Sequence, residues 1–371
     1  MLCDSAMKYL LALHLCISFA CTLWGQEVKF RFDFENADQT LKLLQSENLD
    51  SAELSTLMRL PTTAFLLRKL QIDSSTMVSA LKKAKAGEEA NDEEARLQYG
   101  QVVDELDSLT VYIADVKHRS QDFQQQLSAT LGSYFPGGST SEITIYPMLG
   151  GWATGYVFGD EADKFFVSLQ KLSLDQIVFY AIAEHELFHV VQRANYNLSP
   201  YFEHLDSLGL GEDAAVLANL YNLWLEGSAT YMSRPDKYEG TPGIQAQFAP
   251  LLRNYQRIGL SYFVVDRLTT DIYNLPEDKL RLADAALFSP SFDEVGYFVG
   301  WQMLRALLRD KTEDEKSNLI KYYLSVSPTY FVLDYIKFAK DSTYDYYKFS
   351  ASFEKAVVRL HEMVIQWDAN R

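Results

Sequence analysis

The feature that most constrains this chain is a segment of helical spacing near its middle, AIAEHELFHVVQ at residues 181–192. His185 and His189 are four residues apart, so on a helix their imidazoles lie one turn above each other and can reach one metal ion. Glu186 follows the first histidine, where a carboxylate can take a proton from water bound at the open position of that metal. Apolar neighbours give the helix a buried side. The segment therefore predicts a metal-site helix packed inside a domain.

A catalytic zinc site of this kind needs a third protein ligand. All three cysteines lie within the first 21 residues, so the body of the chain has no thiolate for a structural zinc site. A metzincin would have a histidine six residues after His189, where this chain has Asn195. The known His₂Glu ligand set favours Glu226 as the third ligand. The other candidates are His204 and the acidic pair Glu212 and Asp213.

Two later segments, together with HExxH, resemble elements of the gluzincin metallopeptidases, the group that includes thermolysin-like and M1 enzymes. The segment EGSATY at residues 226–231 resembles the EGxAxY element that carries the third zinc ligand. The segment YFVGWQML at residues 297–304 resembles the YxxGxxxL element of M1-like enzymes. The order of the three elements is also similar, and the resemblance covers about residues 140 to 310. The chain also resembles the uncharacterised bacterial families of zinc-dependent peptidases.

The gluzincin resemblance implies a site for one Zn²⁺ per chain and a role for each residue that matches. The metal ligands would be His185, His189 and Glu226. Glu186 would act as the general base, and Tyr297 would donate a hydrogen bond to the oxyanion. The reaction would be hydrolysis of a peptide bond, and the partner would be a peptide or protein substrate.

The same resemblance implies a strand that binds the substrate. In gluzincins an edge strand about 30 residues before HExxH pairs with an extended substrate, and strand addition of this kind gives affinity through main-chain hydrogen bonds. Gly155, Tyr156 and Val157 occupy that place in this sequence. We therefore expect these three residues to contact the substrate.

Three departures from the gluzincin pattern limit what the resemblance implies. Thirty-six residues separate His189 from Glu226, about twice the usual distance, which predicts that residues 195–212 form an insertion that loops out. The GxMEN element of M1 exopeptidases is absent, so nothing specific supports aminopeptidase activity. Thr230 stands where thermolysin-like enzymes can have an acidic residue that orients a histidine. The group that orients the histidines here is therefore not predicted.

The spacing of apolar residues predicts an α+β fold that is mostly helical. Residues 27–34 alternate as a half-buried strand, and residues 36–135 have helical spacing. Turn-forming residues at 135–141 precede three short β-rich runs, which predict a small antiparallel sheet packed over the HExxH helix. Further helical patterns lie at 174–194, 214–232, 291–309, 313–325 and 345–367. The predicted regions are a signal at 1–25, a strand plus helices at 26–138, and a gluzincin-like domain at 139–371.

The first 25 residues have the pattern of an export signal, in which Lys8 precedes an apolar run of about 15 residues. They predict export to the periplasm, the cell envelope or the medium. Either the signal is cleaved near Gly25, or Cys21 is lipidated and attaches the protein to a membrane. The net charge of 34 − 50 = −16 argues against nucleic acid as a partner, because phosphate binding needs a basic face.

Two other functions fit the same residues. A zinc hydrolase of a non-peptide amide would use the same ligands, because a fold and its ligand set do not define the substrate. A peptidase fold that has lost catalysis would serve as a binding or scaffold protein of the cell envelope. The presence of HExxH, Glu226 and Tyr297 together counts against this second alternative, because a degenerate site usually loses one of its residues.

Overall fold

The computed structural model describes residues 28–136, 142–158, 161, 163–233, 241–276, 279 and 286–370. The predicted signal at residues 1–25, which includes Cys21, lies outside them. Across these described ranges, no helix combines the length and apolar character needed to cross a membrane. Helices make up most of the described chain and a single small mixed sheet accompanies them, which confirms the predicted α+β class.

The N-terminal half is a short strand followed by helices, as the spacing predicts. Strand β1 (Lys29–Phe32) buries Phe30 and exposes the charged residues on either side of it. Asp50 and Asp73 begin two of the helices by accepting hydrogen bonds from backbone N–H groups of the first turn. The helices that follow β1 are α2 (Glu35–Gln45), α3 (Ser51–Arg59), α4 (Pro61–Leu70), α5 (Ser74–Ala86), α6 (Asp92–Ala95), α7 (Tyr99–Asp104), α8 (Leu106–His118) and α9 (Ser120–Leu131).

The sheet has the strand order β1-β2-β4-β3, with β2 (Glu142–Met148), β3 (Gly155–Tyr156) and β4 (Lys164–Ser168). β1 pairs with β2 and β2 with β4 in parallel, and only the β3–β4 pair is antiparallel. The prediction of an antiparallel sheet is therefore wrong for most of its pairs. β1 reaches β2 through helices α2 to α9, a connection long enough for parallel pairing. β4 lies between β2 and β3, which leaves β3 at the edge.

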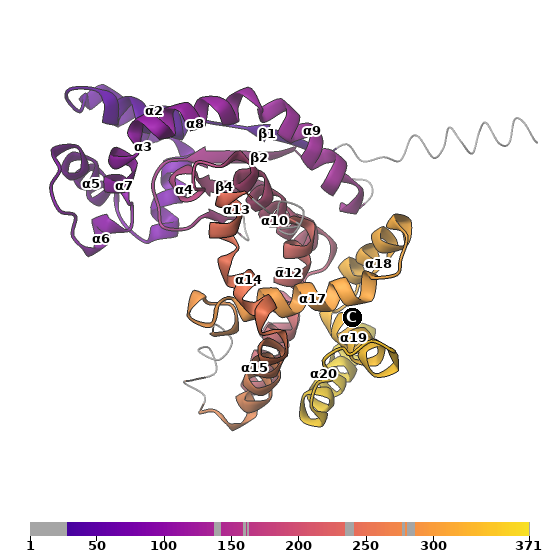
Figure 1. Cartoon of the computed structure of the whole chain (residues 1–371). Coiled ribbons are helices and arrows are strands. Elements are labelled where there is room, and N and C mark those ends of the chain that lie inside the picture. The colour runs from indigo at the N-terminus through magenta and orange to yellow at the C-terminus, as the bar shows by residue number, and fades with distance from the viewer. Residues whose placement is uncertain are drawn as a thin grey trace, which may run out of the picture.

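The HExxH motif lies on α10 (Gln176–Asn195), which packs against β3 and β4. The helix begins after Asp175, whose carboxylate accepts a hydrogen bond from the backbone N–H of Ile177. In Figure 1 the sheet lies between α10 and the N-terminal helices α2, α8 and α9. α12 (Gly211–Ser233) packs on α10 and carries Glu226, so the two longest helices of the described chain meet at the predicted ligands.

The predicted insertion at 195–212 contains α11 (Ser199–Ser207), which packs on α12. Tyr201 of α11 also contacts Trp367 of the last helix, α20 (Ala351–Ala369), with ring centroids 5.1 Å apart. The insertion is therefore held by the C-terminal helices, which form the lower part of the molecule in Figure 1. The other helices of this half are α13 (Pro242–Gln247), α14 (Ala249–Gln256), α15 (Ile258–Asp271), α17 (Val295–Leu308), α18 (Glu313–Ser325) and α19 (Pro328–Asp341).

Candidate metal centre

Three side chains named from the sequence converge between α10 and α12. Oε2 of Glu226 lies 3.2 Å from Nε2 of His185 and 3.2 Å from Nε2 of His189. Within the described ranges, these three residues form the group of potential ligands whose donor atoms all lie within 4.8 Å of one another. Their side chains are 12%, 9% and 16% exposed, in the order His185, His189, Glu226. The group is therefore shielded from bulk water and still reachable from solvent.

The other candidates for the third ligand lie elsewhere. His204 is exposed on α11, and Glu212 is exposed at the start of α12. Asp213 is buried, but its carboxylate pairs with the guanidinium of Arg359. The structure thus brings Glu226 to the histidine pair and leaves the other candidates away from it.

α12 and α17 cross at two glycines, and this crossing brings Glu226 and Tyr297 together. A Cβ at Gly300 would lie 2.0 Å from the carbonyl oxygen of Leu223, and one at Gly227 would lie 2.3 Å from the carbonyl carbon of Gly300. The two backbones are therefore in direct contact, which residues without a side chain permit. Glu226 immediately precedes Gly227, and Tyr297 lies about one turn before Gly300. The glycines of the two motifs thus have a packing role.

Tyr297 lies over the first histidine of the motif. Its ring stacks on that of His185, with centroids 5.9 Å apart and planes inclined by 20°. The pKa of Tyr297 is raised well above 10. Burial of the phenol is the largest cause, and the negative charges of Glu226, Glu186 and Glu294 add to it. The phenol therefore keeps its proton at neutral pH and remains a hydrogen-bond donor.

Burial and mutual attraction act in opposite directions on the ionisation of the ligand group. Burial alone would raise the pKa of Glu226, but the neighbouring imidazoles outweigh it and hold this pKa well below its usual range. Burial alone would lower the pKa of His189, but the Glu226 carboxylate outweighs it and raises this pKa to about 9. A metal ion that binds here would take the place of the proton on His189.

Glu186 lies against the edge strand of the sheet. A Cβ on Gly155 would come within 3.1 Å of Cγ of Glu186 and 3.0 Å of the Phe165 ring, so the strand can pass this close because residue 155 has no side chain. Tyr156, the next residue of the strand, is buried, and its ring stacks on that of Phe166. Val157 lies just beyond the strand. The structure thus brings the predicted substrate strand to the predicted base.

Two residues of the site are absent from the predictions made on the sequence. Oε1 of Gln192 lies 2.7 Å from Nδ1 of His189. Glu294 immediately precedes α17. Burial raises the pKa of its carboxyl, and the nearby charges of His185 and Glu226 respectively lower and raise it. Gln192 follows His189 by three positions on α10, a spacing that places helical side chains near one another, whereas Glu294 has a left-handed backbone just before α17 begins. That spacing is the sequence signal for Gln192, and Glu294 has no signal of this kind.

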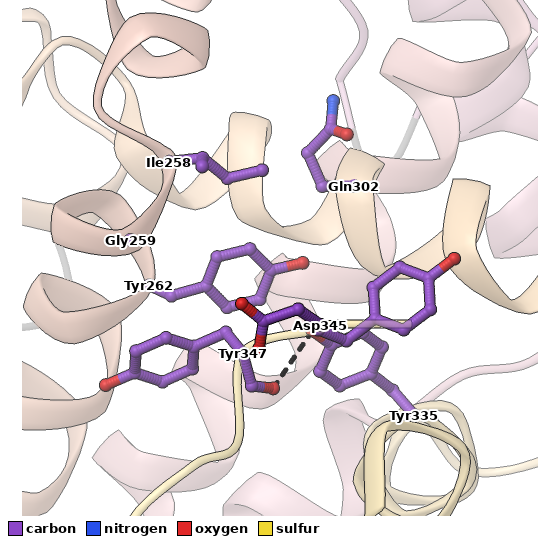
Figure 2. Close-up of a pocket in the computed structure, with 8 residues that line it drawn as sticks. Ile258, Gly259, Tyr262, Gln302, Tyr335, Asp345 and Tyr347 are labelled. Atoms are coloured by element: carbon purple, nitrogen blue, oxygen red, sulfur yellow. Dashed lines mark hydrogen bonds between the residues drawn. The ribbon is translucent and has the colours of Figure 1, made fainter. Parts of the chain in front are cut away.

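A cavity of about 280 Å³ lies apart from this centre, among the C-terminal helices (Figure 2). Its lining comes from α15, α17, α19 and the segment before α20, and includes none of the predicted site residues. The ring of Tyr262 stacks on those of Tyr335 and Tyr347, with centroids 5.8 and 5.1 Å apart. The tyrosines around the cavity thus pack on one another.

The chemistry of the donor set fits zinc. Two imidazole nitrogens and one carboxylate oxygen are the His₂Glu set of catalytic zinc sites, which leave a fourth position for water or substrate. Ligands about 2.0–2.1 Å from a tetrahedral ion lie roughly 3.3 Å apart. The separations of 3.2 Å between Glu226 and each histidine agree with that value.

A comparison with known protein families also points to zinc. Residues 57–344 match the family described as "Putative zinc dependent peptidase (DUF5700)". The match begins within α3 and ends after α19, so it includes most of the N-terminal helices as well as the candidate centre. No curated protein and no solved structure matches the sequence. Because the match covers most of the chain, this protein belongs to the DUF5700 family of putative zinc-dependent peptidases.

Proposed function

We propose that this protein hydrolyses peptide bonds, with one Zn²⁺ held by His185, His189 and Glu226 and with Glu186 as the general base. The position of Glu186 is the observation that carries the proposal. It lies on the helix of both histidines and against β3, the edge strand that can pair with an extended peptide. A centre that only stored a metal would need neither this second carboxylate nor the strand edge beside it.

Each residue of the centre has a defined task in this reaction. Zinc bound here supplies a Lewis acid that polarises the substrate carbonyl and lowers the pKa of a water molecule to about 7. Glu186 takes the proton of the attacking water and passes it to the leaving nitrogen. Tyr297, which stays protonated at neutral pH, donates a hydrogen bond to the oxyanion. Main-chain groups of Gly155, Tyr156 and Val157 orient the peptide by strand addition.

Glu186→Gln is expected to lower kcat by about 10²- to 10⁴-fold and to leave zinc binding unchanged. The amide has the shape of the carboxylate but cannot accept the proton of water. A peptide library is first cleaved with zinc-loaded wild type, and kinetics are then measured on a peptide that it cuts. The matched control is Glu203→Gln, which changes an exposed carboxylate on α11 and should retain wild-type kinetics.

The outcomes of this experiment separate the functions that the same ligands would serve. Wild-type turnover by Glu186→Gln would show that Glu186 is not the base. A wild-type protein that binds zinc but cuts no peptide of the library would contradict peptide hydrolysis. Non-peptide amides would then be screened, and the absence of any turnover would leave a binding protein.

Zinc affinity is expected to rise as the pH increases toward 9. The pKa of His189 in the metal-free protein is raised to about 9, so below that pH zinc must displace a proton from this imidazole. Displacing one proton weakens the apparent affinity about tenfold for each pH unit below that pKa. The measurement is a titration in chelator-buffered zinc at about pH 6.5 and about pH 8.5. An affinity equal at both values would contradict the raised pKa.

A further inference from the structure

The side chain of Gln192 joins the two helices that carry the proposed ligands. It is 3% exposed, and its Oε1 lies 2.7 Å from Nδ1 of His189. Its Nε2 donates hydrogen bonds to the carbonyl oxygen of Leu225 at 2.8 Å and to Oγ of Ser228 at 2.7 Å. Leu225 and Ser228 lie on either side of Glu226 in α12. One side chain of α10 therefore contacts the ring of one ligand and the helical turn that carries another.

The surroundings of the Gln192 amide permit a single orientation. The carbonyl oxygen of Leu225 can only accept, so it must face the NH₂ group of the amide. The hydroxyl of Ser228 donates to the carbonyl oxygen of Trp224 at 2.6 Å, so its own oxygen is left to accept from Gln192. A flipped amide would bring two oxygens together at Leu225. The amide oxygen therefore faces His189.

An acceptor at Nδ1 determines which tautomer of neutral His189 is stable. The amide oxygen of Gln192 carries no hydrogen, so Nδ1 of His189 must carry the proton. Nε2 then carries the lone pair, and it lies 3.2 Å from Oε2 of Glu226, on the side where a metal would bind. We propose that Gln192 is a positioning residue, which selects this tautomer and holds α10 and α12 in register. The inference rests on the proposed zinc function and adds a residue to it.

Gln192 also differs chemically from the partner that the resemblance suggested. Thr230, at the position where an acidic residue could orient a histidine, is buried and uncharged. A carboxylate bonded to a metal-bound histidine makes the imidazole a stronger base, whereas a neutral amide fixes the ring without adding negative charge. Glu226 then supplies the one negative charge of the ligand set.

Gln192→Met tests the proposal, because methionine fills a similar volume but makes none of the three hydrogen bonds. We expect zinc to bind about 10- to 100-fold more weakly than in wild type, the usual cost of losing the partner of a metal-bound histidine. The matched control is Gln101→Met on α7, which removes a partly buried amide that donates to the carbonyl oxygen of Gln170 outside the centre, so zinc affinity should equal that of wild type. Affinities are measured by competition with a chelator, and the metal-free forms are melted in parallel.

Three results would count against the proposal. Equal zinc affinity in Gln192→Met and wild type would overturn it. A loss of affinity that Gln101→Met shares in full would also overturn it, because such a loss would reflect general destabilisation and not the contact with His189. Absence of zinc binding in wild type itself would overturn the proposed function, and the role of Gln192 with it.

Proton NMR of the cobalt-loaded wild-type protein gives a second readout. It needs no variant, so it does not depend on whether Gln192→Met folds. Bound Co²⁺ moves the NMR signals of the N–H protons of its imidazole ligands away from all other proton signals. The Nδ1 proton of His189 should exchange slowly with solvent, because its acceptor on Gln192 is buried. Fast exchange at both histidine ligands, or coordination of His189 through Nδ1, would overturn the inference.

Discussion

Gly300→Ala is expected to lower the free energy of unfolding by about 3 kcal/mol and to weaken zinc binding. The added methyl group would lie 2.0 Å from the carbonyl oxygen of Leu223 and 3.0 Å from Cα of Gly227. Both are backbone atoms, so no change of side-chain rotamer relieves the overlap, and α12 must move away from α17. That movement separates Glu226 from Tyr297, because each lies within about a turn of the contact.

Thermal unfolding and zinc titration of the same samples measure the two effects of Gly300→Ala. A loss of about 3 kcal/mol corresponds to a melting temperature lower by about 4 °C in a chain of this length. The control is Gly100→Ala on α7, where a new Cβ would meet no atom within 4 Å. Alanine there should leave stability unchanged or raise it by up to about 1 kcal/mol. Wild-type melting of Gly300→Ala would show that the helices do not touch at this point.

Local spacing explains which parts of the fold the sequence predicts correctly. The helices expected at 174–194, 214–232 and 313–325 correspond to α10, α12 and α18, because their apolar residues recur at the helical period. The strand expected at the N-terminus is β1 for the same kind of reason, since its side chains alternate. HExxH needs only a helix to bring His185 beside His189, so this part of the site follows from spacing alone.

Strand pairing and main-chain contacts have no such local signal. The runs that form β2, β3 and β4 look like consecutive hairpins, but nothing in them shows that β4 lies between the other two or that β1 joins β2. The role of Gln192 depends on the carbonyl oxygen of Leu225, a group present in every residue. The role of Gly300 depends in the same way on the backbone of Leu223. Such contacts become visible only once α10, α12 and α17 are packed together.

Glu226→Ala is expected to lower zinc affinity by about 10²- to 10³-fold. Zinc sites with four ligands bind with about 10–16 kcal/mol, so one ligand contributes roughly 2.5–4 kcal/mol, or a factor of about one hundred to one thousand. The measurement is the zinc content of the purified protein together with its affinity in competition with a chelator. The control is His204→Ala, which removes a candidate that lies exposed on α11 and should leave zinc binding unchanged.

The same variant tests whether Glu226 controls the ionisation of the histidines. In wild type its carboxylate outweighs the effect of burial and raises the pKa of His189. In metal-free Glu226→Ala that attraction is lost while the effect of burial remains, so the pKa of His189 should fall, as an NMR titration of the imidazole would show. Loss of zinc together with this fall identifies Glu226 as the third ligand. If Glu226→Ala retained zinc at wild-type affinity, another carboxylate would have to be the third ligand. Glu294 would then be mutated next, because it lies close enough for the charges of His185 and Glu226 to affect its pKa.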